Sequence, residues 1–548
     1  MRANSLFYTQ AHAEEGSTKV AHGPRGGKGR KASPARFSYE RREIMENIMS
    51  TISNVNNAKN GVVWGIPMLI LIIGTGIYLT AGMKFFQITH IKHWMNETFL
   101  AIFKKKHVTA HTGKEESSIS QFQALSTALA ATIGVGNIAG VAGAIITGGA
   151  GAVFWMWLSA LFGMMTNYSE NVLGIYYRRK NPKGEWSGGA MYYLQDGLKG
   201  KKVIGVLATP LAVLFSLFCV FASFGIGNMT QVHEIASSME DTFQIPPLAT
   251  GIIIAVIAAL VVLGGIKAIG SVTEKIVPFM ACAYILGTVI VLILNITSVP
   301  AVFAAIFSNA FGLRPIAGAT VGMMIKQAMT MGFKRGVFSN EAGLGSSVMV
   351  HSASNVKEPV VQGMWGIFEV FFDTIVVCTL TAFTVLSSGL IDLDTGEVLS
   401  SATGASLVSE ALSEGLGTLA GGFVAIAICL FAFSTVLGWS FYGTKSCEYL
   451  FGTKATIVYK VIFIVCIVFG ATMSFDLAWE IADTLNALMA IPNLIGVLAL
   501  SGTVFAITGN YINRKLKKSA GAQDTVVTPM LSFDPAIQKM QEETLETE

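Results

Sequence analysis

Apolar residues gather along this chain in runs long enough to cross a lipid bilayer, with short polar connections between them. A helix needs roughly 20 residues to cross about 30 Å of hydrocarbon. Eleven runs meet or approach that length: 62–81, 120–146, 151–176, 205–235, 248–265, 270–297, 317–352, 360–388, 418–443, 455–473 and 482–508. The pattern predicts an all-α polytopic membrane protein with about eleven transmembrane helices.

Two of these runs are interrupted by glycine pairs, Gly134-Val135-Gly136-Asn137 and Gly343-Leu344-Gly345-Ser346. From Gly134 to the end of the apolar run at Thr297 is 163 residues, and from Gly343 to the end of the run at Ile507 is 164. This spacing predicts one extra N-terminal helix followed by two five-helix repeats, at about 118–297 and 315–508, within a membrane domain over 60–510.

Glycine weakens a membrane helix and frees backbone groups that lipid cannot satisfy, so such breaks are typical of ligand cavities in transporters. Close packing of helices through small residues is the alternative. A third string of the same kind, Gly225-Ile226-Gly227-Asn228, shows that the motif is not specific by itself.

Composition and charge support a membrane protein and suggest its orientation. Hydrophobic residues make up 52% of the chain and charged residues 13%, with a mean hydropathy of +0.57, whereas soluble domains have about 25% charged residues. Lys and Arg collect in 84–114, 178–202, 267–275 and after residue 511, which predicts a multi-pass protein of the cell (inner) membrane with these segments and the C-terminus in the cytoplasm. The connections around Glu240-Asp241 and from Glu410 to Glu414 are expected outside.

The two ends of the chain are predicted to lie outside the membrane domain. Residues 511–548 read as a disordered cytoplasmic tail, and 1–59 as an N-terminal extension. In the predicted topology the basic run 23–42 would lie outside, against the rule that basic segments lie in the cytoplasm. One interpretation is that the native chain starts at Met45 and lacks residues 1–44. A disordered basic arm is the alternative.

We expect a chain starting at Met45, without residues 1–44, to insert into the membrane and transport as the full chain does. Radiolabelled uptake normalised to the amount in the membrane measures this. Loss of insertion or of uptake would contradict the interpretation of 1–44 as dispensable.

No nucleophile and base, metal-ligand cluster or phosphate-binding loop is visible, so the sequence does not predict an enzyme. The six cysteines lack CxxC spacing and are interpreted as apolar packing residues. No soluble segment is long enough to couple ATP hydrolysis to transport, and the driving force is therefore expected to be an ion gradient. No cofactor and no nucleic acid is expected.

Three segments resemble the alanine/glycine:cation symporter family: Ala131 to Asn137, the run Gly148-Gly149-Ala150-Gly151-Ala152-Val153-Phe154-Trp155-Met156-Trp157, and Phe338 to Ser346. The resemblance covers about 60–510. It implies a leucine-transporter-type fold, a 5+5 inverted-repeat core with broken first and sixth core helices. It also implies a secondary active transporter that imports a small neutral amino acid, alanine and/or glycine, by symport with Na⁺.

The first break offers backbone N–H groups at a half-helix N-terminus, where the helix dipole favours a substrate carboxylate. Asn137 and Thr132 add hard oxygen ligands suited to Na⁺; an interhelical hydrogen bond is the alternative for Asn137. Similarity to the sixth core helix implies Phe338 as a gate and Ser339 as an ion ligand. The predicted substrate-binding residues are Gly134, Val135, Gly136, Asn228, Gln231, Phe338 and Gly343, and the predicted first Na⁺ site is Thr132, Asn137, Ser339 and Asp373.

The adjacent hydroxyls of Ser434 and Thr435 are similar to a pair that completes a second Na⁺ site in that fold. The implied second site comprises the carbonyls of Ala130, Ile133 and Phe431 with Ser434 and Thr435. Bonding of both hydroxyls back to their own helix is the alternative.

Ionisable residues inside apolar runs are functional hypotheses because burying them is costly. They are Glu170, Lys326, Glu369 and Asp373, and the last two share a helix face. The alternative is a structural pairing of these carboxylates with Lys326, Lys334 or Arg335, and Glu341 is expected to pair with Lys334 or Arg335.

Two other functions stay open. A proton-coupled carrier of the same fold would use Glu170, Glu341 or Asp373 as its proton site, and a symporter for a larger neutral amino acid such as glutamine would share every motif above. A channel or a non-transporting amino-acid sensor is a more remote alternative. The expected partners are a small neutral amino acid, Na⁺ and the lipid bilayer, and the pattern is compatible with a monomer.

Overall fold

A computed structural model describes residues 64–112, 118–312, 321–473 and 475–517. Internal contacts divide the chain into Met1–Ile52 and Ser53–Glu548, and every described residue lies in the second unit. The predicted extension 1–59 and residues 518–548 of the predicted tail lie outside the described residues.

The described part is a helical bundle with one short hairpin. The first half contains α2 (Ile66–Gly82), α3 (Phe86–Thr89), α4 (Ile91–Glu97), α5 (Phe99–Lys104), α6 (Lys106–Thr109), α7 (Gln121–Thr132), α8 (Val141–Gly148), α9 (Gly151–Tyr176), β1 (Arg179–Lys180), β2 (Trp186–Ser187), α10 (Ala190–Tyr192), α11 (Ala208–Phe224), α12 (Thr230–Phe243), α13 (Pro247–Val262) and α14 (Gly265–Leu294). The second half contains α15 (Val299–Ala310), α16 (Val321–Asn340), α17 (Val348–His351), α18 (Pro359–Val370), α19 (Thr379–Ser387), α20 (Gly404–Leu416), α21 (Leu419–Phe451), α22 (Thr456–Thr472), α23 (Phe475–Ala499) and α24 (Ser501–Tyr511).

Helical segments of other pitch join several of these elements. Five have the wider π-helical turn: η1 (Gly136–Gly140), η2 (Tyr193–Gly197), η4 (Gly225–Met229), η6 (Phe371–Cys378) and η7 (Ile512–Leu516). Two have the tighter 3₁₀ turn: η3 (Ile204–Leu207) and η5 (Ile296–Ser298). π-Helical turns occur frequently at functional sites, and η1, η4 and η6 each contain a residue predicted for the site.

The predicted all-α membrane class is confirmed. Each of the eleven apolar runs coincides with one helix or with consecutive helices. Among the described residues, four helices are long and apolar enough to cross a membrane, or up to six if each of two bent pairs forms one span, and four further apolar helices have 10–17 residues. The count of eleven spans therefore stays a prediction.

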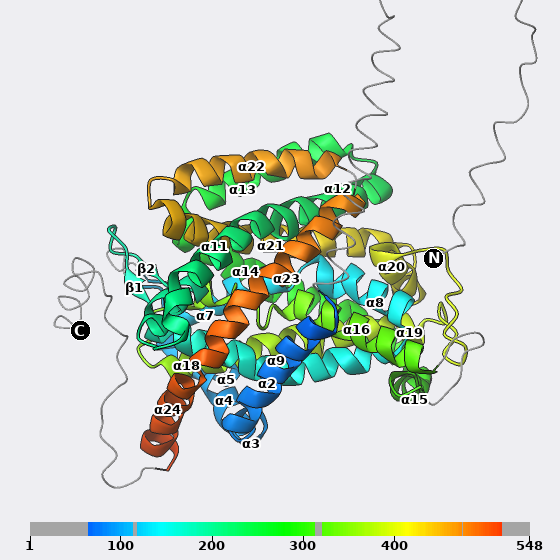
Figure 1. The fold of residues 1–548 in the computed structure, drawn as a ribbon. Coiled ribbons are helices and arrows are strands. Elements are labelled where there is room, and N and C mark those ends of the chain that lie inside the picture. Colours follow the sequence, from blue (N-terminus) through cyan, green and yellow to red (C-terminus); the bar gives the residue numbers. More distant parts are fainter. Residues whose placement is uncertain (1–63, 113–117, 313–320, 474, 518–548) are drawn as a thin grey trace, which may run out of the picture. The chain divides into compact units, whose positions relative to one another are not determined.

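α9 and α21 organise the packing of the bundle. α9 packs against α2, α16 and α18, and α21 packs against α7, α11 and α12 (Figure 1). α7, which contacts α14 as well as α21, begins at a capping box: Ser120 Oγ accepts from the Gln123 N–H at 3.1 Å, and Gln123 Oε1 accepts from the Ser120 N–H at 3.2 Å.

The first predicted break is present. α7 ends at Thr132, the chain is not helical at 133 and 134, and the helix resumes through Val135 into η1 and α8 at an angle of 52°. By contrast, the third glycine string begins η4 within one continuous 40-residue helical run, Ile204–Phe243. That string therefore widens a helical turn without breaking the helix.

The second predicted break is also present. α16 ends at Asn340, and a loop over 341–347 leads to α17. Gly343 and Gly345 have φ of +93° and +72°, values that glycine adopts at little cost, while Glu341 adopts φ of +55°, which is unusual for a residue with a side chain. Three residues of this loop thus have positive φ, and glycine at two of them lowers the cost of the turn.

Candidate functional site

The backbone of the first break is held by side-chain amides. The Gly134 N–H donates to Asn137 Oδ1 at 2.9 Å, and the Val135 N–H donates to Gln231 Oε1 of α12 at 3.4 Å. The Gln231 oxygen thus satisfies a backbone N–H that the break leaves without a helical partner.

Both glycines of the first break allow other helices to approach closely. A Cβ on Gly134 would lie 2.6 Å from Thr435 Oγ1 on α21, and a Cβ on Gly136 would lie 3.3 Å from the Phe338 ring on α16. The structure therefore brings the first break together with Gln231, Phe338 and Thr435, all of which were predicted site residues.

A buried carboxylate in η6 gathers three donors. Asp373 Oδ1 accepts from Asn137 Nδ2 at 2.6 Å, and Oδ2 accepts from Ser339 Oγ and Thr374 Oγ1, each at 2.8 Å. Asp373, Asn137 and Thr374 are fully buried and Ser339 is 1% exposed. The carboxylate and hydroxyl oxygens of this cluster suit a hard cation rather than a soft metal, whereas Asn137 directs its amide nitrogen, which is not a ligand, toward Asp373.

Three of the four residues predicted for the first Na⁺ site thus meet: Asn137, Ser339 and Asp373. Cys378 joins them, with its Sγ 3.4 Å from Asn137 Nδ2 and 3.3 Å from Ser339 Oγ. The interpretation of every cysteine as a packing residue was therefore incomplete, although all six are free thiols.

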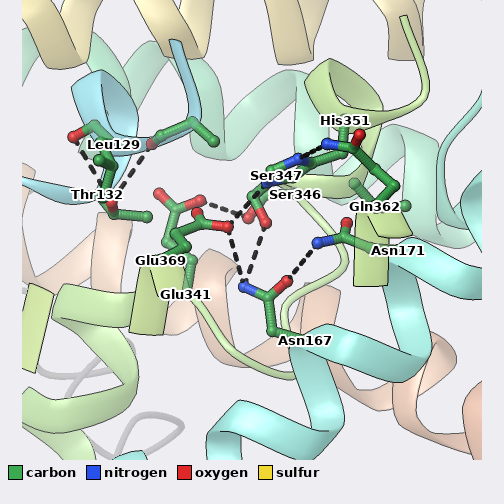
Figure 2. A network of polar contacts seen from close by, with 12 residues as sticks. Leu129, Thr132, Asn167, Asn171, Glu341, Ser346, Ser347, His351, Gln362 and Glu369 are labelled. Atoms are coloured by element: carbon green, nitrogen blue, oxygen red, sulfur yellow. Dashed lines mark hydrogen bonds and ion pairs between the residues drawn. The ribbon is translucent and has the colours of Figure 1, made fainter. Parts of the chain in front are cut away.

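Thr132, the fourth predicted ligand, points elsewhere. Its hydroxyl donates to the carbonyls of Ala128 at 3.2 Å and Leu129 at 3.5 Å in its own helix (Figure 2). Threonine hydroxyls commonly bond back to carbonyls one turn earlier in their own helix, and here this contact keeps the Thr132 hydroxyl on α7 rather than in the Asp373 cluster.

A second group of oxygens lies where α21 crosses the end of α7. Ser434 Oγ lies 3.3 Å from the Ala130 carbonyl oxygen and 2.8 Å from that of Phe431, and Thr435 Oγ1 lies 3.0 Å from both. The two hydroxyls therefore bond back to their own helix and also bridge to α7. The fifth predicted ligand, Ile133, is the residue directly after α7. Carbonyls at the end of a helix lack their helical hydrogen-bond partners.

The oxygens of this second group, Ala130, Phe431, Ser434 and Thr435, are neutral and hard. Such oxygens are ligands for Na⁺ rather than for a transition metal. Four of the five residues predicted for the second Na⁺ site are thus joined by direct contacts.

Two predicted substrate residues are oriented away from the first break. Asn228 Nδ2 donates to the Phe463 carbonyl of α22 at 2.7 Å. The Gly343 carbonyl accepts from Asn493 Nδ2 at 2.8 Å, and a Cβ on Gly343 would meet Leu494 and Thr166. These positions belong to the contacts of η4 with α22 and of the second break with α9 and α23.

A buried polar network that was not predicted surrounds the second break (Figure 2). Glu369 Oε2 accepts from Asn167 Nδ2 at 3.2 Å and lies 2.9 Å from His351 Nε2, and His351 Nδ1 lies 2.5 Å from Gln362 Nε2. Asn167 also reaches Ser347 Oγ at 3.4 Å. α9, α17 and α18 are therefore linked through polar side chains beside the loop over 341–347.

The expected pairing of carboxylates with basic residues is corrected in three places. Glu369 pairs with His351, Glu341 Oε2 accepts from Ser346 Oγ at 2.5 Å, and Lys334 Nζ lies 2.5 Å from Asp483 Oδ2. Glu341 lies in the loop that follows α16, and its side chain bonds to Ser346 of the same loop.

Two further ionisable residues can now be located. Glu170 accepts from Asn493, which also binds the Gly343 carbonyl, so Glu170 supports the second break from α9. Lys326 is exposed in the first turns of α16 and is not a buried charge, contrary to the prediction.

One signal in the sequence pointed to the missed network. Asn167, Glu170 and Asn171 lie at i, i+3 and i+4 in the otherwise apolar α9, and Asn171 Nδ2 donates to Asn167 Oδ1 at 2.8 Å. His351 and Gln362 had no comparable signal because a loop separates them.

A cavity of about 850 Å³ leads toward the first break from the side where the acidic connections lie. Its lining includes Ala139 and Gly140 of η1, Glu234 of α12, Arg335 of α16 and Glu410 of α20. Arg335 Cζ lies 5.6 Å from the centre of the Phe338 ring, and Phe338 is 6% exposed. Phe338 therefore lies directly behind Arg335, a residue of the cavity wall.

Broken membrane helices that hold oxygen clusters beside a polar cavity define a membrane transporter rather than an enzyme. The chain belongs to the sodium:alanine symporter family, whose model matches residues 49–526.

Several known transporters are similar to this chain. It is 46% identical to the sodium/alanine symporter AgcS of Methanococcus maripaludis over 86% of this chain and 100% of that protein. It is 35% identical to the probable sodium/glutamine symporter GlnT of Bacillus subtilis over 85% of this chain and 91% of that protein. Among solved structures, MhsT in complex with L-phenylalanine aligns with a TM-score of 0.47 and 15% identity over 72% of this chain and 90% of that one.

Proposed function

We propose that this protein imports a small neutral amino acid, alanine and/or glycine, by symport with Na⁺ through alternating access. The observation that carries the proposal is the contact of the Ser434 and Thr435 hydroxyls of α21 with the Ala130 carbonyl at the end of α7. This contact joins two helices through neutral oxygens at a break, so a cation bound there would link their relative positions to Na⁺ occupancy. Similarity to AgcS supports alanine as a substrate and Na⁺ as the coupling ion.

The proposed roles follow from the contacts. A substrate carboxylate would bind the Val135 N–H after displacing Gln231 Oε1, and Phe338 would close over the substrate. The short distance from Gly136 to Phe338 favours a small side chain. Na⁺ would bind at the Ser434 and Thr435 cluster and at the Asp373 cluster, and no cofactor beyond the coupling ion is proposed.

The direction of transport follows from the proposed orientation in the cell membrane, with the basic connections and the C-terminus in the cytoplasm. The cavity beside Arg335 and Glu410 would then open outside. One unit charge moving through about 100 mV releases roughly 2.3 kcal/mol, and each tenfold concentration ratio costs about 1.4 kcal/mol. One Na⁺ per substrate would thus sustain roughly fiftyfold accumulation from the membrane potential alone.

A glutamine-type symporter is the second candidate, supported by the similarity to GlnT. The geometry favours the smaller substrates because η1 and Phe338 are in close contact. Competition among unlabelled alanine, glycine and glutamine for uptake of labelled alanine separates the two candidates.

Uptake of labelled alanine into proteoliposomes is expected to require an inward Na⁺ gradient and to stop when choline replaces Na⁺ at constant pH. Na⁺ binding enables substrate binding, and the two affinities must therefore depend on each other. Uptake that persists in choline and follows a pH gradient would favour the proton-coupled alternative. Absence of counterflow would favour a sensor.

Ser434→Ala and Thr435→Ala are each expected to raise the Na⁺ concentration for half-maximal uptake about tenfold, because each removes one neutral oxygen ligand without adding bulk. Substrate affinity at saturating Na⁺ should change less. Ser440→Ala is the matched control, since Ser440 Oγ bonds back to the Leu437 carbonyl of the same helix at 2.7 Å and, in the part of the chain that the structure describes, does not reach α7. If all three variants keep the parent's Na⁺ dependence, the hydroxyl pair serves its helix and the cation binds elsewhere.

A further inference from the structure

A second cavity, of about 710 Å³, lies on the opposite, basic side of the protein. One wall is the β1–β2 hairpin with the following helical segment, and the other is the C-terminal end of α21. Arg179, Lys180 and Lys199 line it together with the carboxylates of Asp196 and Glu448.

Both lining carboxylates already have positive partners. Asp196 Oδ2 lies 3.5 Å from Arg179 Nη1, and Glu448 Oε2 lies 3.0 Å from Lys445 Nζ. Burial raises the pKa of the Asp196 carboxyl, against the opposing charges of Arg179 and Lys199. The positive charges at the cavity therefore exceed the negative ones, and the cavity favours an anion.

The segment that leaves the cavity is apolar and uncovered. Val203 is 91% exposed, Val206 82% and Leu207 50%, and they follow the exposed Lys199, Lys201 and Lys202 in the chain. Val213 of α11, which lines the cavity, is 39% exposed on the same helix as other outward-facing apolar residues. Exposed apolar side chains next to a basic cluster are typical of segments that lie in the membrane interface.

We infer that this cavity binds the headgroup of an anionic phospholipid of the cytoplasmic leaflet, with the acyl chains running along α11. The phosphate chemistry alone would also fit a soluble phosphate. The adjoining apolar residues favour the lipid because they need acyl chains to cover them, and basic residues at a membrane surface attract anionic lipids.

A bound headgroup would contact both walls and would therefore hold the hairpin to α21. Ser187 Oγ of the hairpin already donates to Glu448 Oε1 at 2.7 Å, and Asn181 Nδ2 donates to the same atom at 3.0 Å. Arg178, which precedes the cavity residue Arg179, donates to the carbonyls of Ser354 and Val356, each at 2.6 Å, in the loop that follows α17. Lipid binding would thus stabilise the contact between the hairpin and the end of α21, independently of which substrate is transported.

The test is a lipid titration of the purified full chain in detergent micelles, with neither Na⁺ nor amino acid present. Phosphatidylglycerol is expected to raise the melting temperature in a saturable manner, because a ligand of the native state stabilises it, while phosphatidylcholine should not. Lys180→Gln with Lys199→Gln should weaken this binding roughly thirtyfold, since each basic residue near a membrane contributes about 1 kcal/mol and about 1.4 kcal/mol is tenfold.

Two controls keep the result specific. Lys92→Gln with Lys104→Gln removes the same charge from exposed positions of α4 and α5, in another basic segment expected in the cytoplasm, and should leave binding unchanged. Lys180→Arg with Lys199→Arg keeps the charge and should restore binding, which separates lost affinity from misfolding. Equal loss in the Lys92 and Lys104 variant, or none in the Lys180 and Lys199 variant, would overturn the site. Equal stabilisation by glycerol 3-phosphate at the same concentration would overturn the lipid assignment.

Discussion

Gly134→Leu is expected to abolish Na⁺-dependent uptake and amino-acid binding while the protein still reaches the membrane. A Cβ at this position would lie 2.6 Å from Thr435 Oγ1 and 3.2 Å from Gln231 Oε1. Thr435 Oγ1 is held at 3.0 Å by both the Ala130 and the Phe431 carbonyls, so moving it aside breaks two buried hydrogen bonds. The new side chain would therefore displace the Thr435 hydroxyl, which is proposed to bind Na⁺. It would also displace the Gln231 amide, which lies at the proposed position of the substrate carboxylate.

Gly134→Ala tests the same contact more gently and should lower the uptake rate at least about tenfold, which corresponds to about 1.4 kcal/mol. Gly143→Ala is its matched control in α8, because a Cβ there meets nothing within 4 Å. Surface expression and uptake at saturating Na⁺ are measured for all three variants. Parent-like uptake in Gly134→Ala would show that the approach of α21 to the first break is not part of the site.

The two breaks could be predicted because glycine has a local reason to occur where a membrane helix stops. Gly343 and Gly345 adopt positive φ, and Gly134 sits where the chain leaves α7. The string Gly225 to Asn228 has the same letters, yet it forms a π-helical turn in an unbroken helix. The residue types alone therefore do not distinguish a broken helix from a π-helical turn. The difference depends on which helices pack against the glycines.

The oxygen clusters could be predicted where their residues are neighbours in the sequence. Ser434 and Thr435 are adjacent and lie on one helix, so their shared contact with Ala130 follows once α21 is placed against α7. Asn228 of η4 donates to the Phe463 carbonyl of α22. The sequence does not report that α22 packs beside η4, so this orientation could not be predicted. His351 was missed because its partner Glu369 lies beyond the loop over 352–358, and helical periodicity does not report contacts between residues on either side of a loop.

Asp373→Asn is expected to raise the Na⁺ concentration for half-maximal uptake about a hundredfold or to remove saturable Na⁺ dependence. The substitution keeps the shape of the side chain and removes the only formal charge among Asn137, Ser339, Thr374 and Asp373. A hundredfold loss corresponds to about 2.8 kcal/mol, which is within the range for interactions of a buried charged group. Na⁺ titration of alanine uptake in proteoliposomes measures it.

The fold should tolerate this change, because the amide oxygen of an asparagine can still accept from Asn137 Nδ2 while the hydroxyls of Ser339 and Thr374 turn to accept. Asn137 itself cannot turn over freely, since its Oδ1 holds the Gly134 N–H at 2.9 Å. Loss of charge at Asp373 should therefore also weaken substrate binding through Asn137 and the first break, and added Na⁺ should recover part of it. Glu397→Gln, at an exposed position outside the cluster, controls for net charge. Unchanged Na⁺ dependence in Asp373→Asn, with Ser339→Ala equally unaffected, would assign the Asp373 cluster to structure and leave the α7–α21 oxygens as the remaining candidate for the coupling ion.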